Sequence, residues 1–122
     1  MMEVARIERQ ARELEESLQI VESQIAELEM FKITLDSIMK AKDKEMLSTI
    51  GGRVYLKTKI EDIEKLFVEV GAGVIVKKTP SDTQNILKEQ IHRLKEARLQ
   101  IKSQLEEYYQ YLENFMNEIE EE

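Results

Sequence analysis

Apolar residues recur every three or four positions from about residue 3 to residue 42. A 3.5-residue repeat that continues over five heptads, without Gly or Pro, is typical of a coiled-coil helix. At ~1.5 Å per residue, the helix would be about 60 Å long, so most of it projects beyond a small core. The apolar stripe, here called the seam, consists of Val4, Ile7, Ala11, Leu14, Leu18, Val21, Ile25, Leu28, Lys32, Leu35 and Met39.

Lys32 is the one charged residue on this seam, and two interpretations of it stand. Its stem can lie along the seam while its amine reaches water, or it can act as a register or pairing device. Five further apolar residues lie off the seam: Ile20, Met30, Phe31, Ile33 and Ile38. Because four of them fall in the last third of the helix, we expect this end to pack on the part that follows.

Residues 46–78 change to a two-residue alternation, which predicts β-strands. All four glycines of the chain lie here. Tight hairpin turns require positive φ angles, so we expect Gly51-Gly52 to join strands 46–50 and 53–60. Gly71-Ala72-Gly73 should likewise join strands 66–70 and 74–77. A phosphate-binding role for Gly71 and Gly73 is disfavoured, because a strand rather than a helix follows them.

The two predicted hairpins cannot stand alone. An isolated hairpin is marginally stable in water, and open strand edges invite pairing. One coiled coil cannot cover both hairpins, so we expect copies of this protein or of its relatives to join hairpins in a shared β-barrel. The barrel residues would be those of the apolar faces: Val54, Leu56, Val68, Val70, Val74 and Val76.

A second long helix is predicted from about residue 80 to residue 120. Thr79 can cap it, Pro80 suits its first turn, and Asp82 completes a capping box. Its seam is interrupted only by Arg98 and consists of Leu87, Ile91, Leu94, Arg98, Ile101, Leu105, Tyr108, Leu112, Phe115 and Ile119. Because the two helices have equal lengths and a compact insert joins them, they should run antiparallel.

The fold class is therefore α+β but mostly α: a long antiparallel two-helix coiled coil with two β-hairpins inserted, in one domain spanning residues 1–122. There is no cysteine, which excludes disulfides and thiol chemistry and fits a reducing cytoplasm. The net charge of −7 argues against nucleic acid as the main partner. No apolar run is long enough for a membrane span. His92 stands alone, and no catalytic, metal or cofactor pattern occurs, so we expect no enzyme.

The two chain ends should meet at the far end of the coil, here called the tip. Apolar residues outnumber the seam positions there, and two interpretations stand. Either they close the coil, or they form an adaptable surface for other proteins, for which Met and Tyr are suited. The candidate binding residues are Val4, Ile7, Tyr111, Phe115, Met116 and Ile119.

The sequence resembles the α-type subunit of archaeal prefoldin, and the middle carries the resemblance. Ile50-Gly-Gly followed by Val54-Tyr-Leu-Lys-Thr-Lys-Ile60 is similar to the first hairpin of that family. Val70-Gly-Ala-Gly-Val74 followed by Ile75-Val-Lys-Lys78 is similar to the second. The β-type subunits have a single hairpin, so two hairpins favour the α-type.

The resemblance implies an ATP-independent holdase without cofactors. Two α-type and four β-type subunits would share a double β-barrel, and the coil tips would hold non-native proteins and pass them to a group II chaperonin. The alternative is a structural or adaptor subunit that forms rings or filaments and binds one defined partner.

Overall fold

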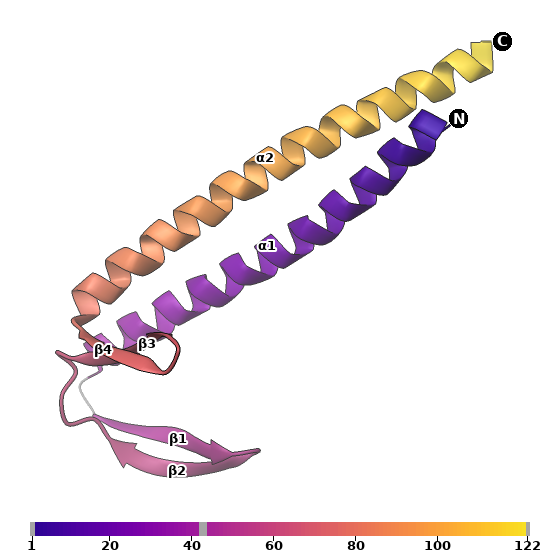
Figure 1. Cartoon of the computed structure of the whole chain (residues 1–122). Coiled ribbons are helices and arrows are strands. Elements are labelled where there is room, and N and C mark those ends of the chain that lie inside the picture. The colour runs from indigo at the N-terminus through magenta and orange to yellow at the C-terminus, as the bar shows by residue number, and fades with distance from the viewer. Residues whose placement is uncertain (1, 42–43, 122) are drawn as a thin grey trace. The chain divides into compact units, whose positions relative to one another are not determined.

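The computed structural model describes residues 2–41 and 44–121, with the side chains of Val70 and Glu121 left out. Two long helices flank four short strands in the order α1, β1, β2, β3, β4, α2 (Figure 1). Their bounds are Met2–Lys40 for α1, Glu45–Gly51 for β1, Val54–Lys59 for β2, Leu66–Gly71 for β3, Val74–Lys78 for β4 and Pro80–Glu121 for α2. The predicted fold class is confirmed, although position 42, the expected end of the first helix, lies outside the described residues.

The chain divides into two compact units. The coil unit comprises the residues up to Glu29 and those from Glu89 onward, and the hairpin unit comprises Met30–Lys88. Among the helices of the described residues, none combines the length and the apolar character that a membrane crossing requires.

In the coil unit, α1 and α2 run antiparallel, so that the two chain ends lie at the same end of the coil (Figure 1). The seam is the core of this unit: Ile7, Ala11, Ile25, Ile91 and Leu105 are buried. No described side chain of the protein is less than 2% exposed. A pair of helices can bury only one stripe of each partner, so the protein has a line of buried residues rather than a three-dimensional core.

Polar contacts between the helices show how the two helices are aligned in the coil unit. The amine of Lys95 lies 3.1 Å from a carboxylate oxygen of Glu29, and that of Lys102 lies 3.8 Å from Glu22. One heptad closer to the chain ends, the hydroxyl of Tyr109 donates a hydrogen bond to Glu15. Each contact is thus displaced by seven residues from the last, forward on one helix and backward on the other.

A column of glutamates on α1 therefore faces a column of positions on α2 whose residue type changes along the helix. Glu8, Glu15, Glu22 and Glu29 recur at heptad spacing, and their partner positions hold Met116, Tyr109, Lys102 and Lys95. The two ion pairs lie far from the tip, and tyrosine and methionine replace lysine toward it.

The hairpin unit contains the inner ends of both helices. α2 begins as expected, because the backbone N–H of Asp82 donates to the hydroxyl of Thr79 at 3.1 Å. The reciprocal capping-box bond from the Asp82 carboxylate is not among the hydrogen bonds of the described part. Leu35 and Leu87 continue the buried seam.

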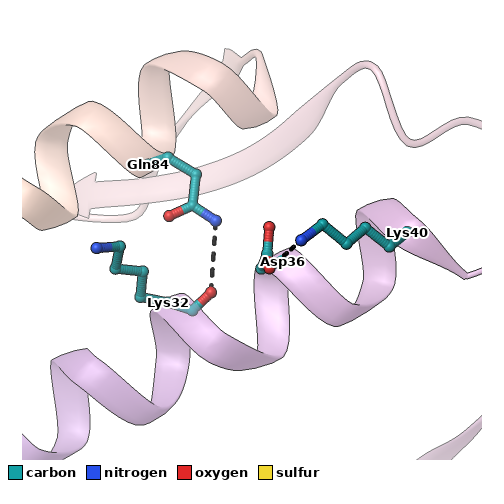
Figure 2. A network of polar contacts seen from close by, with 4 residues as sticks. All are labelled: Lys32, Asp36, Lys40 and Gln84. Carbon is teal, nitrogen blue, oxygen red and sulfur yellow. Dashed lines mark hydrogen bonds and ion pairs between the residues drawn. The ribbon is translucent and has the colours of Figure 1, made fainter.

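Gln84 forms a polar link between the helices in this unit (Figure 2). Its side-chain amide donates to the backbone carbonyl of Lys32 at 3.4 Å, while its own carbonyl oxygen is buried without a hydrogen-bond partner among the described residues. Lys32 is half-buried, and Asp36 forms an ion pair with Lys40 at 3.0 Å rather than with α2. The half-burial of Lys32 is compatible with both interpretations of this residue.

The expectation that the last third of α1 packs on the β part is wrong for most of its off-seam residues. Met30, Phe31 and Ile33 are exposed, and only Ile38 is half-buried. The physical reason is that α2 already occupies the seam side of α1, and no described part of the chain covers its outer side.

Both hairpins are two-stranded and antiparallel. The first turn falls one residue later than predicted, because Gly51 pairs with Val54 after a register irregularity. The second loop lies within the predicted Gly71-Ala72-Gly73 but is one residue shorter, because Gly71 pairs with Val74. The loops are therefore Gly52-Arg53 and Ala72-Gly73. In the second loop φ is +51° at Ala72 and +75° at Gly73, as a type I′ turn requires.

We expect reversal of the two lysines facing the acidic column, Lys95→Glu with Lys102→Glu, to destabilise the coil by about 1 kcal/mol, since half-exposed ion pairs contribute little each. Adding Glu29→Lys and Glu22→Lys should restore most of the loss, because it inverts each pair. Thermal unfolding followed by circular dichroism at low salt measures both changes. A quadruple variant no more stable than the double variant would contradict the assigned register.

We expect Ala72→Gly to stabilise the protein by up to about 1 kcal/mol, because alanine is strained in the left-handed conformation. The matched control is Ala26→Gly on the exposed face of α1, which should destabilise by about 1 kcal/mol through lower helix propensity. Chemical denaturation measures both. If the two substitutions shift stability in the same direction, the turn assignment is wrong.

Candidate functional site

The first hairpin has apolar side chains on both faces, beside polar ones, and neither face is covered. Val54 and Leu56 are exposed by 58% and 54%, and their strand positions place them on the same face. On the opposite face, the amine of Lys57 lies 2.9 Å from the carboxylate of Glu45. The hairpin is held by its backbone ladder and by a 2.8 Å hydrogen bond between the hydroxyls of Ser48 and Thr58. Uncovered apolar side chains of this kind are typical of an interaction surface.

The second hairpin has apolar side chains on both faces, although Glu69 and Lys77 share one of these faces with Phe67 and Ile75. Leu66, Val68 and Val76 are half-buried on one face, whereas Phe67 and Ile75 are 69% and 62% exposed on the other. The amine of Lys77 lies 5.7 Å from the centre of the Phe67 ring. A strand that is apolar on both faces is adapted to burial on both sides.

The predicted barrel residues thus differ in their surroundings. Val54, Leu56 and Val74 are exposed, Val68 and Val76 are half-buried, and the side chain of Val70 lies outside the described part of the structure. Sequence reasoning did not include Phe67 or Ile75 in this set. Their signal was present in the sequence, because apolar residues occupy consecutive positions in Leu66-Phe67-Val68 and in Val74-Ile75-Val76.

Each strand also has one open edge. β1 pairs only with β2, and β3 pairs only with β4. Unpaired backbone groups along such edges can accept a further strand. Exposed apolar side chains and open edges therefore occur on the same four strands.

At the tip, the structure divides the six predicted binding residues into two groups. Ile7 is buried and Val4 and Phe115 are half-buried, so these three close the seam. The exposed group consists of Tyr111, Met116 and Ile119, at 38%, 56% and 51%. Met2 is also exposed. The structure thus separates predicted residues that close the coil from predicted residues that face outward.

Two shallow grooves lie beside Tyr109. One has a volume of about 260 Å³ and opens next to Ala11, whose small side chain leaves space on the seam; it is lined by Glu8, Ala11, Arg12, Glu15, Tyr109 and Leu112. The other, of about 390 Å³, is lined by Lys102, Leu105, Glu106, Tyr109, Gln110 and Glu113. Both are lined by apolar side chains, glutamates and one basic residue each.

The described residues form no cluster of three metal-ligating side chains. His92 is exposed on α2, with its Nε2 atom 3.0 Å from a carboxylate oxygen of Glu96 one helical turn away. The exposed apolar side chains of the hairpins and of the tip are typical of interaction surfaces.

Comparison with known proteins agrees with this view. A family model described as prefoldin subunit matches residues 7–122. The chain is 30% identical over 113 residues to prefoldin subunit alpha of Methanococcus aeolicus, covering 92% of this chain and 76% of that protein. It is 29% identical over 87 residues to prefoldin subunit alpha of Methanopyrus kandleri, covering 70% of this chain but only 55% of that protein.

Among solved structures, the chain is similar to filamentous PFD from Methanocaldococcus jannaschii, determined by cryo-electron microscopy. The TM-score is 0.79 at 22% identity, with 97% of this chain and 99% of the other covered. At this identity the similarity shows the fold alone. Taken with the family match over residues 7–122, the two hairpins and the antiparallel coil lead to one conclusion. The chain belongs to the prefoldin family, where it groups with the archaeal α-type subunits.

Proposed function

We propose that the protein is a subunit of an ATP-independent holdase that binds non-native proteins at its tip. The prefoldin family is a family of chaperones rather than enzymes. The observation that carries the proposal is the outward exposure of three apolar or aromatic side chains close together at the tip: Tyr111, Met116 and Ile119. Unfolded chains expose apolar segments of many shapes, and Met and Tyr adapt to such variety.

The hairpins provide the assembly surface in this proposal. Their open edges and exposed apolar faces support a shared β-barrel with β-type subunits, in a hexamer of two α-type and four β-type subunits. Burying Phe67, Ile75, Val54 and Leu56 would remove apolar area from water at roughly 25 cal/mol per Å². Assembly would keep the tips free to hold a client in the cytoplasm and to pass it to a group II chaperonin.

A structural role is the second candidate, because the structural neighbour named above is filamentous. In that role the same hairpins would join copies of the chain into a filament, and the coils would bind one defined partner. The breadth of clients separates the two roles, since a scaffold should ignore most unfolded proteins.

We expect Met116→Ser with Ile119→Ser to abolish most of the suppression of aggregation of a denatured protein in the absence of ATP, because it removes the exposed apolar side chains of the tip. The matched control is Leu99→Ser, which removes an apolar side chain that is 70% exposed on the same helix away from the tip. Light scattering measures aggregation. Deleting the residues after Leu112 should have the same effect and leave assembly intact.

If the truncated protein holds clients as well as the full chain, the tip does not bind them. Equal loss in the Leu99→Ser control would instead indicate that apolar surface of α2 away from the tip is needed as much as the tip.

We expect Leu56→Glu to prevent assembly with a β-type subunit, because a barrel interface would bury the new charge without a partner. The control is Ile20→Glu, at an equally exposed apolar position of the coil unit. Native mass spectrometry of each variant with and without a β-type subunit reads the stoichiometry. A hexamer that forms with Leu56→Glu would show that this face of the hairpin is not the interface.

A further inference from the structure

Negative charge is concentrated in the two chain segments that meet at the tip. Residues 103–122 contain seven Glu and no Lys or Arg, while residues 1–16 contain five Glu and three Arg. Their combined formal charge is −9, whereas the whole chain carries −7. Residues 17–102 are therefore slightly basic, at +2. The acidity of the protein is a property of its tip.

This charge is not compensated by neighbouring side chains on α2. The carboxylates of Glu106, Glu107, Glu113, Glu118 and Glu120 are exposed, and within the described part of the chain no Lys or Arg forms an ion pair with them. On α2, the last lysine is Lys102, which lies 3.8 Å from Glu22. A charged group from another molecule can therefore pair with these carboxylates without displacing an existing partner.

The carboxylates lie beside the exposed apolar side chains. Glu113 and Glu120 are three and four residues from Met116, which places all three on the same face of α2. Met116 and Ile119 are neighbours by the same spacing. The grooves at Tyr109 repeat this combination, although Arg12 and Lys102 also line them.

We infer that the tip prefers segments of unfolded protein that combine apolar side chains with Lys or Arg, and disfavours acidic segments. The inference rests on the proposed function and names the class of segment that the same surface binds. Apolar contact supplies the affinity, whereas complementary charge supplies the discrimination. Lys and Arg suit this surface, because their aliphatic stems can cover Met116 while their charged ends reach Glu113 or Glu120.

The test uses the full chain and three fluorescent unfolded peptides of equal length and apolar content, with Lys, Gln or Glu at the remaining positions. Fluorescence anisotropy gives the dissociation constants. At low salt we expect the Lys peptide to bind about tenfold more tightly than the Glu peptide, equivalent to about 1.4 kcal/mol, with the Gln peptide between them. At 1 M salt, where the Debye length is about 3 Å, most of this difference should disappear.

Two variants locate the effect. Glu113→Gln with Glu120→Gln should reduce the preference for Lys several-fold while the Gln peptide binds as before. The matched control, Glu61→Gln with Glu64→Gln, neutralises two exposed carboxylates of the hairpin unit and should leave the preference unchanged. Circular dichroism establishes that both variants retain the helical content of the parent.

The remaining outcomes separate this inference from the proposed function. If the three peptides bind equally and Met116→Ser with Ile119→Ser abolishes binding, the inference is overturned and the holdase proposal stands. If no peptide binds, the proposed function fails and the inference fails with it. A Lys/Ser peptide without apolar residues that binds as tightly as the apolar Lys peptide also overturns the inference, because charge alone would then explain binding.

Discussion

The structure depends on one constraint: each helix has a single apolar stripe, and the only surface available to cover it is the stripe of the other helix. Ile7, Ala11, Ile25, Ile91 and Leu105 meet along this line, and no described side chain is buried from all sides. The contact between the two stripes accounts for most of the apolar surface that the chain can bury without a partner. Apolar residues of the hairpins and of the tip lie off this line, and several of them remain exposed.

The coil and the hairpins could be predicted from periodicity, because a 3.5-residue repeat and a two-residue alternation each correspond to one geometry. The first turn was missed by one residue, since two consecutive glycines leave open which of them carries the turn, whereas the second loop was predicted one residue too long. The environment of Met30 and Ile33 could not be predicted either, because periodicity tells that a residue is off the seam but not whether anything covers it. The acidic column from Glu8 to Glu29 was present in the sequence, but its pairing needed the register.

The two exposed surfaces differ in the kind of partner they suit. On the hairpins, regular backbone edges and β-branched side chains favour a fixed, repeated partner, because strand pairing requires matching register. At the tip, Met116 is flexible and Tyr111 is partly exposed to water, so neither side chain requires a partner in a matching register. In the proposed function, the hairpins would be permanently occupied by other subunits, while the tip would remain available to clients.

The heptad spacing of Glu15, Glu22 and Glu29 against Tyr109, Lys102 and Lys95 has a consequence for how such an arm can evolve. Inserting seven residues into each helix at matching positions preserves every seam contact and every polar pair, and lengthens the coil by about 10 Å. An insertion of seven residues in one helix alone shifts the glutamates of α1 by one heptad relative to their partners on α2. The length of the coil can therefore change by one heptad at a time while the residues at both of its ends stay the same.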